Sequence, residues 1–582
     1  MTLDIDDARA LGRSSSVPLV VLTLRCGAVL RVSDRATTVG GNNYDPLLMN
    51  SPTVSESVNR EDSSAINSDC TLVLSNESMS LLGTVYSSLV AAHDAYPLAG
   101  AAVTLSHVLR DGSQETAEVL QFVGVTDEPS DISEKSLSLR CSSRAQYRAR
   151  IASRPRLDAS SFAAARPDDY GRAFPIVMGV VPAVEVVRSE FGAATTLSAA
   201  ADNSQTTITV TSTAGFASAG TIVIDAEWIT YTGITATSFT GCTRGYSTSD
   251  PAAHALGARA YVYQASYVGV VADHGIDSIG SVYGAFSDGL LAFTGATVAN
   301  TTYGGKTRAV LTKAAPLPLQ STGGPVLDRV FVDVNGMESD DAIYGTVGSV
   351  VARPDYVMKK YLTAVLGYAA ADIDSTSFDI AGAWYAANNY ALSVLVTDEN
   401  RLAALYRMAY ECRSVIWESA GKWYLLVLPD VCSPVVREIA RGDFDPDRPF
   451  SCGYTRADQV CNYLTVRHSK INGPAAANNL WQGSVVLSDV RPLEDTVPGM
   501  LDLRYVRSAA MASSVGGLAL KQRRQSYKTI SFPVFWQHTD LQIGDSVTIS
   551  GLGFWEGVKF WINGETREGI NRGTFNAIEW WG

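Results

Sequence analysis

The sequence predicts a β-rich α+β protein made of several domains. Its 582 residues are enough for about four domains of ordinary size. Up to residue 350, short runs of β-branched and aromatic residues alternate with polar ones and are separated by Gly, Ser and Asn, which is typical of strands. Apolar residues at helical spacing dominate only after Pro354, where an α+β region is expected to begin.

The first 190 residues are expected to be mainly strands and loops. Residues 37–69 are rich in Ser, Asn and Gly, so a long polar loop is predicted there. Four X-Pro pairs interrupt residues 146–190, which are expected to be largely irregular. The regular elements predicted in this part are strands within 17–33, 70–75 and 117–125 and a short helix within 82–92.

Residues 195–264 are predicted to form a small all-β module inserted into a larger β-domain. Ile208 and Val210 alternate with threonines, and Ile222 and Ile224 repeat this period of two. Glycines between the runs suit turns that need a positive φ. The segment has a distinctive order of residues: Gly220-Thr221, Ile224, Glu227, Ile229, Tyr231-Thr232-Gly233, Phe239-Thr240, Arg244-Gly245, Ala252-Ala253-His254 and Gly257-Ala258.

The part after Pro354 is expected to contain helices as well as strands. A helix over 402–409, with Thr397 as its N-cap, precedes a hairpin over 414–428. The aromatic residues Trp555, Trp561, Trp580 and Trp581 are expected in a core. The other predicted elements are helices over 355–366 and 504–523 and strands over 462–467, 530–536 and 546–549.

Charge and composition exclude some classes of function. The formal net charge is −13, from 46 Lys and Arg against 59 Asp and Glu, whereas a general DNA-binding surface needs clustered cations. An acidic surface facing a passage would repel DNA, although a mildly acidic soluble protein is the simpler interpretation. No secretory signal and no apolar run of about 18 residues is visible, so folding in a cytoplasm is expected.

The cysteines predict free thiols rather than a metal centre. Eight cysteines are scattered along the chain without any C-x-x-C pair, and buried free thiols are usual in a reducing cytoplasm. Cys412, Cys432, Cys452 and Cys461 lie close enough in sequence to raise a metal or iron–sulfur cluster as an alternative. Their spacing matches no ligand motif, so no cofactor and no metal site is predicted.

No catalytic residues are assigned, and the protein is not expected to be an enzyme. The six histidines form no H-E-x-x-H pattern, and no G-x-S-x-G occurs. Residues 443–447 begin like a calcium loop, but Arg448 and Tyr454 replace the required Gly and Glu, so a surface acidic turn is expected. Glu227 lies in an apolar strand, but a general acid needs a partner group within reach, and a solvent-facing Glu is the simpler interpretation.

Two sets of motifs resemble proteins of phage tails. The residue order of 195–264 resembles a module found in many tailed-phage baseplate and tail-tip proteins. A second arrangement resembles the hub proteins of phage tail tips, the central tail hub family. It consists of Arg413, Trp417 and Gly421 to Leu425, then Tyr454 to Arg467, a long helix, and Leu541 to Ile549.

The resemblance implies a specific domain organisation. It implies two tail-tube-like β-domains, a small all-β insert and an intervening α+β domain. The first tube-like domain is expected at 1–194 and, after the insert at 195–264, to continue at 265–350. The α+β domain is expected at 351–430 and the second tube-like domain at 431–582.

The resemblance also implies a function. The protein is expected to be a virion structural protein, a homotrimeric hub of a siphophage that closes the distal end of the tail tube and gates DNA passage. Its implied partners are a distal tail protein ring, the tape-measure protein C-terminus and tail fibre or tip proteins, with no specific nucleic-acid binding. It is expected at the virion tail tip after synthesis in the host cytoplasm.

Two alternatives stay open from the sequence. One is a tail-associated glycan hydrolase that uses Glu227 or another acid, which predicts a cleft with paired carboxylates. The other is an adhesin whose insert binds host glycan, which predicts exposed aromatic residues on the insert.

Overall fold

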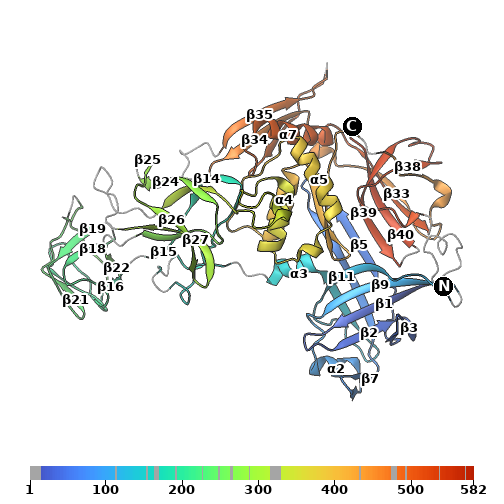
Figure 1. Cartoon of the computed structure of the whole chain (residues 1–582), viewed down its shortest axis with the longest axis horizontal. Helices are drawn as coiled ribbons and strands as arrows, with labels where there is room; N and C mark the ends of the chain where they lie inside the picture. Colours follow the sequence, from blue (N-terminus) through green and yellow to red (C-terminus); the bar gives the residue numbers. More distant parts are fainter. Residues whose placement is uncertain are drawn as a thin grey trace.

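Strands dominate the structure, which confirms the predicted β-rich α+β class. The computed structural model describes residues 15–581 except 112–113, 152–154, 163–164, 166–168, 191–192, 226, 247–248, 263–266, 287–288, 315–328, 432–433, 473–480, 492–493, 536–537 and 570–571. The molecule is elongated, with the strands of residues 194–262 at one end and the first and last strands of the chain toward the other (Figure 1). Within the described residues, none of the helices combines the length and the apolar character that crossing a membrane requires.

Residues 15–143 form an antiparallel β-unit with its own core, which includes Val20, Leu72 and Leu105. Its elements are β1 (Ser15–Thr23), β2 (Val29–Ser33), β3 (Thr37–Val39), β4 (Asn42–Tyr44), β5 (Thr53–Val58), β6 (Ala65–Ser75), β7 (Met79–Leu81), β8 (Thr84–Tyr86), α2 (Leu89–Ala95), β9 (Ala102–Asp111), β10 (Gln114–Glu115), β11 (Val119–Thr126) and β12 (Ser136–Ser143). We call this part the N-terminal unit.

The structure confirms the strands predicted at 17–33, 70–75 and 117–125 but not the long loop expected at 37–69. That segment contains β3, β4, β5 and the start of β6. Val54, Glu56 and Val58 of β5 point inward and alternate with serines, so β5 has the period of a strand despite its polar composition. The helix expected at 82–92 is shorter and begins at Leu89, because Ser88 caps it by accepting a hydrogen bond from the Ala91 N–H.

The part of the chain from Arg437 onward contributes a second β-unit and a small sheet covered by a helix. The elements are β32 (Arg437–Ala440), η6 (Arg441–Asp443), β33 (Ser451–Tyr454), η7 (Ala457–Gln459), β34 (Tyr463–Lys470), β35 (Trp481–Ser488), β36 (Pro498–Asp502), α7 (Ala509–Arg523), β37 (Lys528–Phe535), β38 (Ser546–Ser550), β39 (Lys559–Glu568) and β40 (Arg572–Glu579). We call β32, β33 and β37–β40 the C-terminal unit; its core includes Ile439, Phe532 and Phe575.

Helix α7 packs on the sheet of β34, β35 and β36. It begins at Ala509, with Ser508 as N-cap, rather than at 504 as predicted. Gly516 lies where a Cβ atom would be 2.5 Å from Val466 and 2.7 Å from Leu487, so this glycine permits the close approach of helix and sheet. The predicted core position of Trp555, Trp561, Trp580 and Trp581 is confirmed, since all four are buried.

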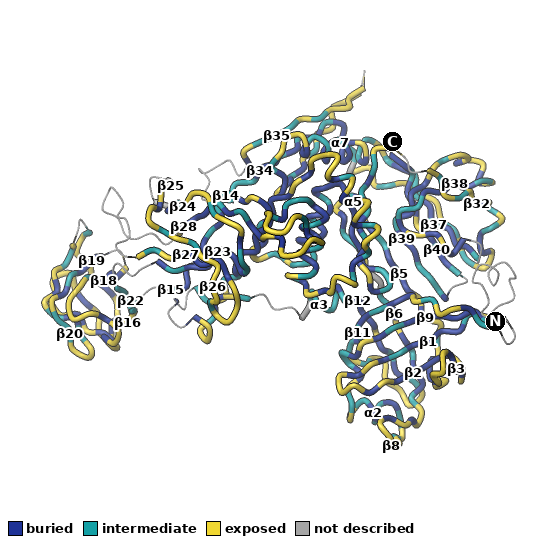
Figure 2. The backbone as a smooth tube through the Cα atoms, viewed as in Figure 1, coloured by how far each residue is buried: buried dark blue, intermediate teal, exposed yellow. Residues whose placement is uncertain are grey.

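One sheet joins the N-terminal and C-terminal units. Within the described residues it has the strand order β2-β1-β9-β11-β12-β6-β5-β39-β40-β37-β33, and β5 pairs antiparallel with β39. We call the β5–β39 pairing the seam. Figure 2 shows that buried segments run along both strands of the seam. The first and last parts of the chain are therefore held in one hydrogen-bonded layer.

Residues 176–335 contain a β-sandwich interrupted by the insert. The sandwich consists of two four-stranded sheets in the described residues, in the orders β14-β28-β24-β25 and β15-β23-β27-β26. Its core includes Val181, Val271 and Leu311. The elements are β13 (Ile176–Met178), β14 (Val180–Glu185), β15 (Val187–Glu190), β23 (Tyr267–Ala272), β24 (Ser278–Phe286), β25 (Gly289–Ala292), β26 (Thr297–Tyr303), β27 (Lys306–Lys313) and β28 (Val330–Asn335). The segment expected to be irregular at 146–190 thus ends in β13–β15, after a short helix α3 (Arg144–Ile151).

Residues 194–262 form a compact all-β module, called the insert module below. Its strands are β16 (Ala194–Thr196), β17 (Thr207–Thr209), β18 (Gly220–Ile224), β19 (Glu227–Tyr231), β20 (Gly233–Thr235), β21 (Ser238–Thr240) and β22 (Arg259–Val262). They enclose a separate core that includes Ile208, Ile222 and Phe239. Strand β15 pairs with β23 and β16 pairs with β22, so the chain enters and leaves the module side by side.

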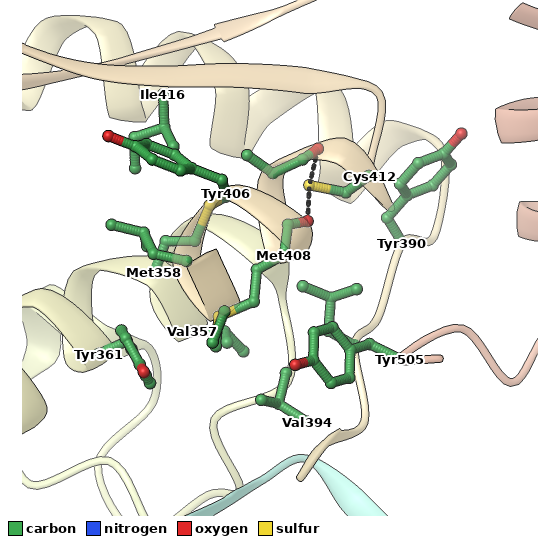
Figure 3. Packing of buried hydrophobic residues seen from close by; sticks show 14 of the residues in the cluster. Val357, Met358, Tyr361, Tyr390, Val394, Tyr406, Met408, Cys412, Ile416 and Tyr505 are labelled. Carbon is green, nitrogen blue, oxygen red and sulfur yellow. Dashed lines mark hydrogen bonds between the residues drawn. The ribbon is translucent and has the colours of Figure 1, made fainter. Parts of the chain in front are cut away.

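Helices and a hairpin between residues 342 and 427 pack around a large core (Figure 3). Met358, Tyr361 and Ile416 meet there. The elements are η3 (Ala342–Tyr344), α4 (Pro354–Lys360), the π-helix η4 (Tyr361–Val365), η5 (Ala370–Asp372), α5 (Ser375–Ala387), β29 (Val394–Val396), α6 (Arg401–Tyr410), β30 (Ser414–Ser419) and β31 (Lys422–Val427). The predicted helix over 402–409 is confirmed, but its N-cap is Asn400 and not Thr397, because the Asn400 side chain accepts from the Leu402 and Ala403 N–H groups.

A single methyl group at residue 179 is expected to destabilise the contact between the sandwich and the helical region. Gly179 joins β13 to β14 at φ +71°, and an added Cβ would lie 2.0 Å from the Leu392 carbonyl oxygen. We therefore expect Gly179→Ala to lower the free energy of unfolding by on the order of 2–4 kcal/mol. Urea denaturation checks this, with Gly171→Ala as control, since Gly171 also has positive φ but open space at the Cβ position. Equal losses in the two variants would contradict the steric explanation.

Candidate functional site

A cleft of about 370 Å³ opens beside the seam, and we call it the seam cleft. Three parts of the chain form its walls. The N-terminal unit contributes β5 and β11, the β30–β31 hairpin contributes aromatic side chains, and the C-terminal unit contributes β39 with the loop at 539–543. The side chains that matter below are Glu56, Trp417, Tyr424, Glu565 and Arg567.

Two buried carboxyl groups face each other in the seam. Glu56 on β5 and Glu565 on β39 are direct partners in the antiparallel register, and they are 5% and 8% exposed. Side chains that lie directly opposite in such a pair point to the same face of the sheet, with Cβ atoms about 4.5–5.5 Å apart. The pairing therefore brings two acids together beneath the cleft.

Arg567 binds one of these acids and the loop beside it. Its Nε and Nη2 donate to the two carboxylate oxygens of Glu565 at 2.9 and 2.8 Å. The same guanidinium donates to the carbonyls of Thr539 and Leu541 at 2.6 and 2.8 Å. A bidentate guanidinium–carboxylate pair is strong and has a fixed geometry. Glu565 is therefore held in place by Arg567.

The pKa of Glu56 is raised well above its ordinary value, which favours the protonated form. Burial raises the pKa of Glu56, and the negative charge of Glu565 raises it further, to about 8, although a hydrogen bond from Ser419 and the charge of Arg567 oppose this. Two adjacent acids that share one cation are most stable when one of them is neutral. The seam is therefore most stable with one proton bound.

An aromatic pair covers one wall of the seam cleft. Trp417 and Tyr424 are cross-strand neighbours in the hairpin, and their rings stack with centroids 5.6 Å apart and planes at 23°. Gln121 on β11 donates its Nε2 to the Gly569 carbonyl at 2.6 Å, while its buried Oε1 has no partner among the described residues. The rings of Trp417 and Tyr424 and the carboxyl groups of Glu56 and Glu565 together line the cleft.

The carboxyl pair has the wrong geometry for glycoside hydrolysis. The two carboxyl groups of a glycosidase flank the scissile bond from different sides. Glu56 and Glu565 project from the same face of one sheet, and Arg567 occupies both oxygens of Glu565. The arrangement favours a proton-dependent contact between the two β-units.

Glu227 has a structural place in the insert module. It is buried rather than solvent-facing as predicted, with 1% exposure. Arg244 donates to both of its carboxylate oxygens at 2.8 and 2.6 Å, and the N–H groups of Gly245 and Ala252 add bonds of 2.9 and 3.0 Å. His254 Nε2 lies 2.8 Å from the same carboxylate. Glu227 thus holds Arg244, Gly245, Ala252 and His254 beside the strands β18 and β19.

The same contacts keep Glu227 ionised. Burial alone would raise the pKa of Glu227, but hydrogen bonds from Arg244, Ala252, His254 and Gly245 outweigh burial and lower the pKa to about 2. A carboxyl group that holds no proton at neutral pH cannot donate one. Glu227 is therefore unsuited to the role of general acid.

The cysteines that the structure describes share no ligand site. Cys412 is buried and its thiol lies 3.0 Å from the Met408 carbonyl oxygen, Cys461 is buried, and Cys452 is exposed. Cys432 lies outside the described residues. Among the residues that the structure describes, no three His, Cys, Asp or Glu side chains could hold a metal ion together.

The acidic segment 443–447 is not entirely a surface turn. Asp443 lies in η6, and its side chain accepts from the Ala440 N–H at 2.9 Å. Asp445 is buried at 1% exposure, and its carboxylate accepts from the Asp447 N–H at 3.0 Å. The aspartates thus order the local backbone instead of surrounding an open loop.

Comparisons with known proteins give structural likenesses only. No family model and no curated protein matches the sequence. The solved structures that resemble the chain include phage tail, baseplate and gene transfer agent proteins. A tail protein from Neisseria meningitidis is 10% identical, with 97% of this chain and 96% of that chain covered and a TM-score of 0.38.

Two further solved structures have similar values. A 43 kDa prophage tail protein from Shewanella oneidensis is 8% identical, with 97% of this chain and 98% of that chain covered and a TM-score of 0.37. A chain of a native gene transfer agent virion is 14% identical, with 54% of this chain and 78% of that chain covered and a TM-score of 0.39. All three TM-scores are below 0.5, so no residue role is transferred from these proteins.

Proposed function

We propose that this chain is a structural protein of a phage tail and that three copies form a hub at the distal end of the tail tube. The resemblance of residues 195–264 and of the motifs between 413 and 549 to tail-tip proteins supports this proposal. The structural observation that carries it is the seam, because the β5–β39 pairing places two β-units of one chain side by side in one sheet.

The seam suggests how a ring is built. Two β-units in each of three copies give six units, which matches the six-fold tail tube that the resemblance implies. Head-to-tail contacts between neighbouring copies give a closed ring when the rotations from one copy to the next add up to a full turn. We assign the N-terminal and C-terminal units to the tube-like domains. We then assign the predicted continuation at 265–350 to the separate sandwich, because its strands share a core with residues 177–186.

The remaining parts are assigned to contacts outside the ring. The hub would bind the distal tail protein ring above it and fibre or tip proteins below, and would hold the end of the tape-measure protein. Its net charge of −13 suits a passage that does not retain DNA. The insert module lies far from the seam in Figure 1, so we assign it to the outer face.

The glycan-hydrolase alternative lacks a supporting observation, and the adhesin alternative has one exposed aromatic residue in its favour. A glycan hydrolase needs a general acid, but Glu227 is ionised and structural. The seam carboxyl groups lie on one face of a sheet and do not flank a substrate from two sides. For an adhesin, exposed aromatic residues on the insert module are expected. Its aromatics Trp228, Tyr231 and Phe239 are buried, whereas Tyr246 is 47% exposed.

The mass of the purified full chain in solution tests the proposal. We expect light scattering to give three times the mass of one chain, and electron micrographs to show a three-fold ring with a central passage or plug. The mass should be independent of dilution over a wide range, because obligate interfaces of this kind are large. A single-chain mass at every concentration, with no ring in the micrographs, would contradict a self-assembling hub.

A further inference from the structure

A small cavity lies where three distant parts of the chain meet. The turn between β5 and β6 contributes Arg60 and Ser63, the region after α6 contributes Arg413, and helix α7 contributes Leu518 and Gln522. Its volume is about 10 Å³. That space holds one small molecule or one monatomic ion, and larger oxyanions do not fit.

The polar atoms around this cavity that lack partners are all hydrogen-bond donors. Within the described part of the chain, Arg60 Nε, Nη1 and Nη2, Arg413 Nε and Gln522 Nε2 are buried and have no partner. The three side chains are 3%, 4% and 5% exposed. Buried donors are normally satisfied, and each unsatisfied one costs about 1–3 kcal/mol. Five such donors around one cavity indicate an acceptor inside it.

Arg60 brings a positive charge to the cavity, and the nearby charge of Glu61 acts on it without forming an ion pair among the described residues. Arg413 is paired with Asp430 at 3.0 Å, whereas Arg60 has no carboxylate partner among the residues described. The Arg60 guanidinium lies 4.9 Å from the ring centroid of Tyr527 and 5.0 Å from that of Trp581. These rings attract the cation but accept none of its in-plane N–H bonds. Burial lowers the pKa of Arg60 to about 10, so it stays charged at neutral pH.

We propose that this cavity binds one monovalent monatomic anion, such as chloride, between Arg60, Arg413 and Gln522. A halide accepts several N–H bonds and neutralises the buried cation. A water molecule would satisfy fewer donors and would bring two O–H groups that need acceptors. Ser63 already donates its hydroxyl proton to the Ser414 carbonyl, so its oxygen is one acceptor beside five unpaired donors. The five unpaired donors therefore favour the anion over water.

The proposed ion would connect parts of the chain that the seam does not join. Arg60 belongs to the N-terminal unit, Arg413 precedes the β30–β31 hairpin, and Gln522 lies near the end of α7. A ligand that binds only the folded state stabilises it in proportion to the logarithm of its concentration. Halide should therefore stabilise this junction whether or not the chain is a tail hub.

Crystals of the full chain grown or soaked in sodium bromide test the proposal directly. We expect a bromide anomalous-difference peak within hydrogen-bonding distance of Arg60 and Arg413. An empty cavity, or density without anomalous signal, which indicates water, would overturn the proposal. This test needs no variant, so it decides the question even if substitutions prevent folding.

Thermal unfolding gives a second readout in solution. At constant ionic strength, replacing sodium gluconate by sodium chloride should raise the Tm of the wild-type chain by on the order of 2 °C. Arg60→Met should lose this difference, while Arg456→Met, at an exposed arginine, should keep it. A chloride-dependent difference that persists in Arg60→Met would also overturn the proposal.

Discussion

Replacing Arg244 with methionine is expected to destabilise the insert module strongly while the stability of the rest of the chain is unchanged. The substitution leaves Glu227 buried and ionised without its guanidinium partner. Breaking a buried pair in this way costs about 3–5 kcal/mol. A module of this size has a net stability of about 3–10 kcal/mol, so most of its stability would be lost. Hydrogen exchange of the amides in β18 and β19 should accelerate by about 10²–10³-fold.

A second substitution, at Asp225, distinguishes the effect of the buried Glu227–Arg244 pair from that of the exposed part of the same hydrogen-bond network. Asp225 lies at the exposed end of the network, where its carboxylate is 2.7 Å from His254 Nδ1 and is 63% exposed. Asp225→Asn should therefore cost less than about 1 kcal/mol, and asparagine tolerates the positive φ of this residue. Exchange in β1 and β9 should be unchanged in both variants. Equal acceleration in Asp225→Asn and Arg244→Met would show that burial of the pair is not the cause.

Local patterns in the sequence were sufficient to predict many elements. The helix at 402–409 and the hairpin at 414–428 were predicted because their periodicity and turn residues lie within a few positions of each other. The N-cap was misplaced by three residues, from Asn400 to Thr397, since several polar residues precede the helix. The polar sequence of β5 predicts a loop, because its partner β39 lies at the other end of the sequence and leaves no local signal.

The candidate sites depended on contacts that local patterns do not reveal. The motif residues Glu227, Arg244 and His254 were recognised, but their convergence on one buried carboxylate was not, because the loop path between them is irregular. The seam carboxyl groups gave no signal at all. Ser55 and Thr566, which flank them, are 511 residues apart and meet only in the folded sheet. No pattern within either strand marks the other as its partner.

The protonated Glu56 predicts that the seam weakens as the pH rises. The pKa of Glu56 is raised from 4.5 to about 8 by burial and by Glu565, so the folded state binds a proton that the unfolded state releases above its own pKa. This contribution is complete below about pH 4.5 and is lost as the pH rises through about 8. It amounts to on the order of 3–5 kcal/mol across that window.

Glu56→Gln should remove this pH dependence, because the amide is neutral at every pH and has nearly the shape of the protonated acid. We expect the variant and the wild type to have similar Tm values near pH 5. Near pH 9 the variant should be more stable by on the order of 5 °C. Calorimetry at a series of pH values measures the difference in Tm between the variant and the wild type. The titration of all other groups largely cancels in this difference.

The exposed residue Glu134 provides the matched control, since Glu134→Gln makes the same chemical change away from the seam. Its Tm should follow that of the wild type across the whole range. Glu565→Gln should behave differently from both, because it removes the acid that raises the pKa of Glu56 but leaves Arg567 without its bidentate partner. That variant should be destabilised at every pH. If Glu56→Gln were less stable than the wild type near pH 9, the seam would hold an ionised Glu56, and its pairing with Arg567 would be stronger than the effect of burial.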